Sequence, residues 1–125
     1  MYKFFFLLFI STPAFADDWS KADAQREAAY LVLHTMDWAQ TRQIAKNPQC
    51  VAGQKEPCLS EENGILGDHP SVAEVNRYFI LTGAAQYLIA KAVPEKYRAP
   101  FQYLTIGHDF GYVVHNYSIG IRIKF

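Results

Sequence analysis

Charged residues are scarce in this chain: they make up 19 % of its 125 residues, against about a quarter in typical soluble domains. The twelve basic and twelve acidic side chains cancel, and neither sign forms a run. The sequence therefore lacks the charged surface with which proteins bind nucleic acids or anionic membranes. Half of the residues are hydrophobic and 15 % are aromatic, which excludes intrinsic disorder. We expect a folded domain and no nucleic acid partner.

Long apolar runs are also missing. The longest, Phe4–Ile10, follows Lys3 and precedes Ala14-Phe15-Ala16, whose alanines occupy the two positions that a signal peptidase reads. A membrane anchor needs about 20 apolar residues, so this pattern predicts a signal peptide over residues 1–16. Residues 17–125 then form a single exported domain, periplasmic or secreted and with membrane association as an alternative.

Cysteine is limited to Cys50 and Cys58, which lie in a polar stretch with turn-forming glycine and proline. The spacing is not C-x-x-C, and the chain has no second cysteine pair to complete a zinc site. Because an exported chain meets oxidising conditions, the pair predicts a structural disulfide.

Helix signals divide the rest of the chain. Ser20 precedes a segment without proline or glycine that predicts a helix over Ala22–Lys46. Ser71 and Glu74 form a capping box before a helix that runs to about Val93. We expect a third helix from about Phe101 to His115, after a short turn or half-helix over residues 95–99.

The last nine residues, 117–125, alternate between apolar and polar side chains, which predicts a strand. A lone strand has unpaired backbone groups, so it could bind a protein partner or a second copy of the chain. The expected fold is all-α: a small three-helix bundle with a disulfide-stapled loop and a C-terminal strand or extended tail.

A two-span membrane protein is the alternative architecture, with helices near residues 75–93 and 101–121. Gly107 and Gly111 have the spacing at which helices approach closely in lipid. Arg77 and Lys91 interrupt the first segment and Asp109 the second, and ionised groups are costly in a bilayer. The sequence therefore favours a soluble or peripheral helical domain.

A polar stripe marks the first helix. Tyr30, His34, Asp37 and Thr41 lie on one face because they are spaced by three or four residues. We interpret this stripe as the solvated side of an amphipathic helix, with its apolar side formed by Ala29, Val32, Leu33, Met36 and Ala39. The functional alternative is a polar binding face.

Asp109 is out of place, since it is ionisable within an apolar stretch of the third helix that also contains His108 and His115. If this helix packs on the first, these residues could meet His34 and Asp37. That cluster would be either a hydrogen-bonded network that fixes helix register or a site for a divalent metal such as zinc or iron. No H-E-x-x-H motif supports the metal alternative, and no cofactor is predicted.

Catalytic signatures are missing too. The chain has no G-x-S-x-G nucleophile motif and no glycine-rich phosphate loop before a helix. We therefore expect a binding or envelope-associated protein and not an enzyme.

Two short motifs, Asp37-Trp38-Ala39-Gln40-Thr41 and Glu62-Asn63-Gly64-Ile65-Leu66-Gly67, resemble small uncharacterised prokaryotic envelope proteins. Those proteins pair a D-x-x-x-T helix with an E-x-N-P-I-L-G-type loop that leads into hydrophobic helices. This chain has Gly64 in place of the proline, and a cysteine-bracketed insertion between the motifs. The resemblance implies no activity, but it adds Glu62 and Asn63 to Asp37 and Thr41 as a candidate polar group.

Overall fold

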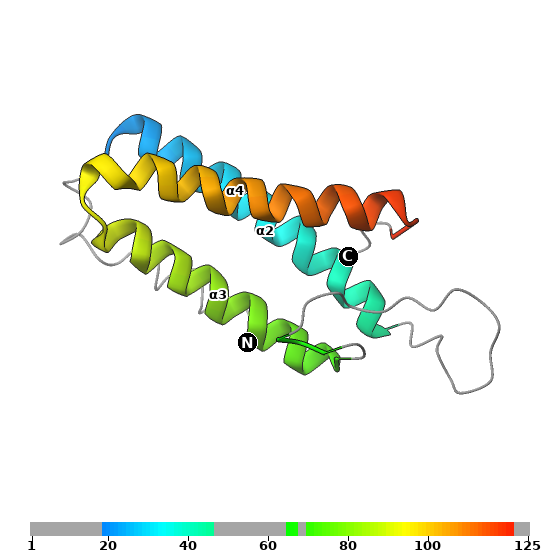
Figure 1. Ribbon diagram of the computed structural model, residues 1–125. Helices are drawn as coiled ribbons and strands as arrows, with labels where there is room; N and C mark the ends of the chain where they lie inside the picture. The colour runs from blue at the N-terminus through cyan, green and yellow to red at the C-terminus, as the bar shows by residue number, and fades with distance from the viewer. Residues whose placement is uncertain (1–18, 47–64, 68–69, 122–125) are drawn as a thin grey trace, which may run out of the picture.

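The computed structural model describes residues 19–46, 65–67 and 70–121. Within them the chain forms three helices: α2 spans Lys21–Lys46, α3 spans Val72–Ala92, and α4 spans Glu95–Ser118 (Figure 1). The prediction of an all-helical, three-helix bundle is confirmed. The predicted signal peptide and the Cys50–Cys58 disulfide lie outside the described residues.

The first two helices begin where the sequence predicts. Ser20 and Asp23 cap α2 reciprocally: the Ser20 N–H donates to Asp23 Oδ2 and the Asp23 N–H donates to Ser20 Oγ, both at 3.0 Å. Ser71 Oγ accepts the Glu74 N–H at 3.1 Å and caps α3. These side chains satisfy backbone donors that have no partner within the helix.

The third helix is longer than predicted, because α4 is continuous from Glu95 and contains Pro100. From the sequence we expect a turn or half-helix over residues 95–99. Arg98 explains the difference: its Nε donates to the carbonyl of Ala90 at 2.9 Å and so ties the first turns of α4 to the end of α3. This contact offsets the backbone hydrogen bond that Pro100 cannot donate.

The predicted C-terminal strand is wrong for residues 117–121. α4 ends in a Schellman motif: the Ile121 N–H donates to Asn116 O at 3.0 Å and the Gly120 N–H to Tyr117 O at 3.1 Å. Gly120 has a φ of 93°, a conformation that glycine adopts without steric cost. Ile121 is buried against the bundle, so its apolar side chain completes a helix cap. Residues 122–125 lie outside the described range.

The helices are arranged with α2 and α4 side by side and pointing the same way, while α3 runs in the opposite direction (Figure 1). Few large apolar side chains are buried between them. Instead the buried side chains are mostly polar: Asp23, Glu27, His34, Asp37, Gln40, Thr41, Gln86, Arg98, Gln102, Asp109 and Asn116. The bundle therefore has a polar interior.

No helix in the described ranges is long and apolar enough to cross a membrane. The two-span alternative near residues 75–93 and 101–121 is therefore not supported. Gln86 interrupts the apolar character of α3 and Asp109 that of α4, because both belong to the polar interior of the bundle.

Candidate functional site

The buried polar residues form a continuous seam along the three helices. On α2 they recur every four and three residues, as Asp23, Glu27, Tyr30, His34, Asp37 and Thr41, and the buried apolar residue Ile44 continues the spacing. This heptad spacing keeps one face of a helix against its neighbours. The α4 residues that bond to this stripe lie about 75 residues further along the chain than their α2 partners. This separation is constant because the two helices are parallel, so polar residues pair at successive levels along the bundle.

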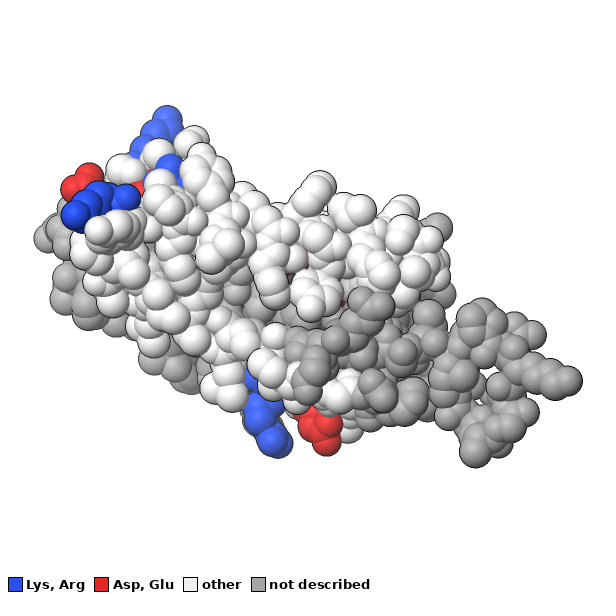
Figure 2. All heavy atoms as spheres, in the orientation of Figure 1, with Lys and Arg blue, Asp and Glu red and all other residues white. Residues whose placement is uncertain are grey.

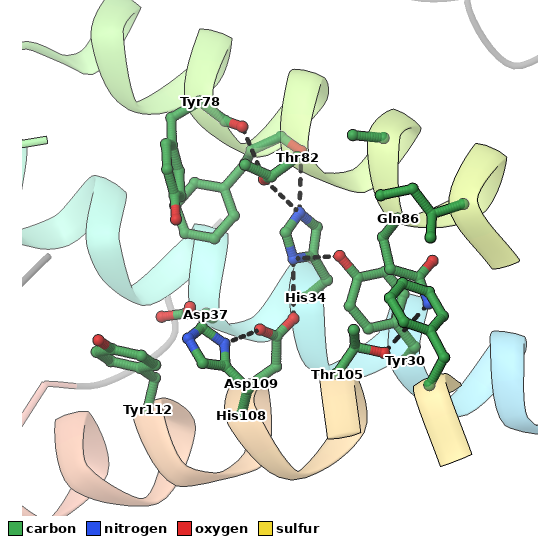
Figure 3. A pocket seen from close by; sticks show the side chains of 14 residues that line it. Tyr30, His34, Asp37, Tyr78, Thr82, Gln86, Thr105, His108, Asp109 and Tyr112 are labelled. Atoms are coloured by element: carbon green, nitrogen blue, oxygen red, sulfur yellow. Dashed lines mark hydrogen bonds and ion pairs between the residues drawn. The ribbon is translucent and has the colours of Figure 1, made fainter. Parts of the chain in front are cut away.

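His34 lies at the centre of the seam and contacts both other helices (Figure 3). Its Nδ1 is 2.8 Å from Asp109 Oδ2 of α4, and its Nε2 is 2.9 Å from the carbonyl oxygen of Phe79 of α3. Tyr30 Oη is 3.1 Å from Nδ1. A carbonyl and a carboxylate both accept hydrogen bonds, so this environment favours the imidazolium form, in which both ring nitrogens donate.

Hydrogen bonding overcomes desolvation at His34. Burial alone would lower the pKa of His34, but the hydrogen bonds to Asp109 and Phe79 and the negative charges of Asp109 and Asp37 raise it. Burial and the charge of Asp109 also raise the pKa of Tyr30, which keeps the phenol protonated. The centre of the seam is thus a buried ion pair beside a neutral phenol.

A second level of the seam surrounds Glu27. Its Oε2 accepts hydrogen bonds from Gln102 Nε2 at 3.1 Å and Gln86 Nε2 at 3.3 Å. Burial raises the pKa of Glu27, against the opposing effect of these hydrogen bonds. Glu27 Oε1 and Gln86 Oε1 are buried and accept no hydrogen bond from the described residues. This level therefore has more acceptors than donors.

A third level lies beyond His34. Asp37 Oδ1 is 3.4 Å from Thr41 Oγ1 and 3.3 Å from Asn116 Nδ2. Asn116 Nδ2 is also 3.3 Å from Gln40 Oε1, and Gln40 Nε2 donates to Val113 O at 3.2 Å. Thus the structure brings Asp37 and Thr41 of the predicted polar group together, whereas Glu62 and Asn63 lie outside the described residues.

Of the other two candidate histidines, His108 contacts the centre from its edge and His115 lies apart from it. His108 Nδ1 donates to Asp109 Oδ1 at 3.1 Å, but 61 % of its side chain is exposed. His115 is half-buried nearly two turns further along α4 and does not line the cavity beside His34 in the described part of the chain. No group of three or more His, Cys, Asp and Glu side chains among the described residues is placed to hold a metal ion. Because both nitrogens of His34 donate hydrogen bonds, the metal alternative gains no support.

A cavity of about 310 Å³ opens beside His34, between α3 and α4 and with α2 as its floor (Figure 3). Aromatic rings form much of its wall, from Tyr30, Tyr78, Phe79, Phe101 and Tyr112. Its polar lining includes His34, Asp37, Thr82, Gln86, Thr105 and Asp109. Sequence reasoning missed the α3 residues Thr82 and Gln86, although they have the same three- and four-residue spacing as the stripe on α2.

The outer surface corrects the predicted solvated face of α2. The polar stripe faces inward, while Val32 is 60 % exposed. The centres of all three helices, residues 28–41, 78–90 and 99–121, have Asp37 and Asp109 as their only acidic or basic residues other than histidine, and both are buried. We call this surface the uncharged belt. On the face shown in Figure 2, charged side chains form separate clusters with an uncharged surface between them.

No family model, curated protein or solved structure matches this chain. Its function has to be inferred from the polar seam, the cavity and the belt.

Replacing Gly83 with alanine tests how tightly His34 is held. A Cβ at Gly83 would lie 3.3 Å from both Cδ2 and Nε2 of His34, and the hydrogen bonds on both sides of the ring prevent it from moving away. We expect the free energy of unfolding to fall by about 1 kcal/mol, because overpacking outweighs the higher helix propensity of alanine. Urea denaturation measures the change. Gly107→Ala is the control: its Cβ meets nothing within 4 Å, so stability should rise by about 0.5 to 1 kcal/mol. Equal effects of the two substitutions would contradict the prediction.

The raised pKa of His34 predicts a pH dependence of stability. A group whose pKa is higher in the folded state stabilises the fold below its unfolded value, here about 6.5. This stabilisation is lost as the pH rises through the folded pKa, with a slope of at most about 1.4 kcal/mol per pH unit. Urea denaturation between pH 6 and 9 should show the decline, and His34→Gln should remove it. Glu27, whose pKa is also raised, makes its own pH-dependent contribution to stability from about pH 4.5 upward. Both the wild type and His34→Gln contain Glu27, so the difference between their profiles reports on His34. Parallel pH profiles of the two would refute the assignment.

Proposed function

We propose that the protein is an exported, non-enzymatic binding protein of the cell envelope, whose uncharged belt lies in the apolar part of a lipid surface. The observation that carries this proposal is the inverted distribution of side chains: the bundle buries its polar residues and exposes apolar ones. Exposed aliphatic side chains occur on every helix: Leu31 and Val32 on α2, Ile80, Leu81, Leu88 and Ile89 on α3, and Leu104 and Val114 on α4. Apolar exposure of this extent marks an interaction surface.

Lipid fits this surface better than a protein partner does. A partner chain covers one side of a molecule, whereas the belt includes residues from all three helices. Tyr97, Tyr103 and Tyr117 are exposed on α4, and tyrosine is enriched where proteins meet the interface between lipid and water. The belt extends about 20 Å along α2 and α3, since each residue of a helix adds about 1.5 Å. A hydrocarbon core is about 30 Å thick, so we propose that the bundle lies in one surface.

The hydrogen bonding of the seam favours binding over catalysis. The protons of His34 are shared with Asp109 and Phe79, and the Thr82 and Thr105 hydroxyls donate to backbone carbonyls. Thr82 Oγ1 lies 3.4 Å from His34 Nε2, but this nitrogen has the closer Phe79 carbonyl as its hydrogen-bond acceptor, so His34 is not placed as the general base that would activate the hydroxyl as a nucleophile.

Flotation with phosphatidylcholine vesicles tests the proposal. We expect the purified full chain to float with the vesicles. A triple variant, Val32→Glu, Leu81→Glu and Leu104→Glu, places charges in the belt at positions that are 60 %, 61 % and 72 % exposed, so folding should change little. It should bind at least about tenfold more weakly, because charged side chains are costly to bury in lipid.

The matched control adds the same three charges outside the belt, at the exposed positions Ala22, Ala73 and Ala92, and should float like the wild type. All three proteins share residues 1–18, so differences among them report on the belt alone. Equal flotation of the belt variant and the control would overturn the proposal. So would a wild type that stays with the soluble fraction, or one that forms an oligomer in buffer and does not bind vesicles.

A further inference from the structure

The cavity beside His34 has a composition that the lipid-facing belt does not explain. It is bounded by side chains from all three helices and lies against the buried polar seam. At about 310 Å³ it is at the lower end of the size range of small-molecule sites. Because a water molecule occupies about 30 Å³, the volume suits a compound of about ten non-hydrogen atoms.

The polar lining includes one hydrogen-bond acceptor, Gln86 Oε1, that has no donor among the described residues. Gln86 donates both to Glu27 and to Thr105, at 3.3 and 3.2 Å through Nε2. This fixes its amide orientation, because the flipped amide would place Oε1 against the Glu27 carboxylate. Gln86 Oε1 consequently has no donor among the described residues. The carboxylates of Asp37 and Asp109 also line the cavity. A ligand that donates hydrogen bonds would complement this wall.

Aromatic faces make up the rest of the wall. Tyr30 stacks on His34 and Phe79 packs against the other side of the same imidazole, with ring centroids 5.0 Å apart in both cases. Tyr78, Phe101 and Tyr112 complete the apolar lining. Faces of such rings attract cations as well as other rings. An anion would instead meet two carboxylates at close range.

We propose that this cavity binds a compact organic amine: a protonated amino group attached to a ring or a short apolar body. The ammonium group donates a hydrogen bond to Gln86 Oε1, which has no donor among the described residues, and the apolar body packs among the aromatic rings. His34 and Asp109 form the floor as a neutral ion pair and remain bonded to each other.

Three probes of nearly equal shape separate the contributions of charge and ring: phenethylamine, 2-phenylethanol and phenylacetate. Isothermal titration calorimetry with the full chain should give a Kd below about 1 mM for phenethylamine, within the range for a ligand of this size. The neutral alcohol and the anion should each bind at least about tenfold more weakly. No binding of the amine, or binding of either other probe with equal affinity, would overturn the proposal.

The location is tested by filling the cavity. Ala85 lines the cavity from an exposed position on α3, so Ala85→Phe should fill it without removing a polar contact. We expect phenethylamine affinity to fall at least about tenfold. Ala73→Phe, at an exposed position of α3 outside the cavity, should bind as the wild type does. Thermal melting of both variants establishes that they are folded. Undiminished binding by a folded Ala85→Phe would place the amine elsewhere and overturn the assignment.

Discussion

Replacing Asp109 with alanine is expected to lower the free energy of unfolding by about 3 to 5 kcal/mol. The carboxylate is 2.8 Å from Nδ1 of His34, and both side chains are at least 90 % buried. Alanine would leave an imidazolium in the polar seam without its compensating charge. Since domains of this size are stabilised by about 5 to 15 kcal/mol, a loss of this size should be visible as a large shift in the urea midpoint.

Two further variants make this prediction specific. His108 contacts the same carboxylate, but 61 % of its side chain is exposed, so His108→Ala should change stability by no more than about 0.5 kcal/mol. The double variant His34→Leu and Asp109→Leu should be more stable than Asp109→Ala, because it removes both charges from the interior. A double variant that is no more stable than Asp109→Ala would contradict the buried ion pair.

The ends of α2 and α3 could be predicted because their signals are local. Ser20 and Asp23, or Ser71 and Glu74, satisfy the first backbone N–H groups of a helix without help from the rest of the chain. Pro94 stops α3 through the conformation of its own ring. The start of α4 depends instead on Arg98 reaching Ala90, a contact that a sequence pattern does not contain.

The environment of the polar stripe was harder to predict than its geometry. Spacing placed Tyr30, His34, Asp37 and Thr41 on one face, and the structure has them there. The same spacing occurs in soluble helices with a solvated face, and in bundles with a polar interior. A comparison of all three helices could have distinguished these cases. The middle of each helix has few polar residues outside its own stripe. The remaining faces are therefore apolar, which is not the pattern of a helix with one solvated side.

The error at the C-terminus arose from treating alternation as sufficient for a strand. Alternating apolar residues also fit a helix that ends and turns back. Gly120 was the informative residue, because a glycine just past a helix is typical of a Schellman cap, and a following apolar residue such as Ile121 packs onto the last turn. The heptad register of α4 continues to Asn116, which also favoured helix.

Replacing Asp23 with alanine is the other substitution with a large expected effect. Asp23 Oδ2 accepts from the Ser20 N–H at 3.0 Å and from Arg98 Nη1 at 3.2 Å, and its Oδ1 pairs with Arg26. Alanine would remove the acceptor of the Ser20 N–H and the carboxylate that compensates the buried Arg98 guanidinium, while Ser20 Oγ would still cap the backbone N–H of residue 23. We expect a loss of about 3 to 5 kcal/mol, mainly from the ion pair, measured by urea denaturation.

The pH dependence of this contribution has the opposite sign to that of His34. Burial alone would raise the pKa of Asp23, but the hydrogen bonds from Ser20 and Arg98 and the charge of Arg98 lower it. Its stabilisation is therefore complete above the unfolded value of about 3.8 and is lost as the pH falls through the folded pKa. The difference in stability between wild type and Asp23→Asn should stay constant from pH 7 to about 5 and shrink below pH 4. Glu74→Ala, at an exposed position in the first turn of α3, should cost no more than about 0.5 kcal/mol. A similar cost at Asp23 would mean that the fold does not depend on its contact with Arg98.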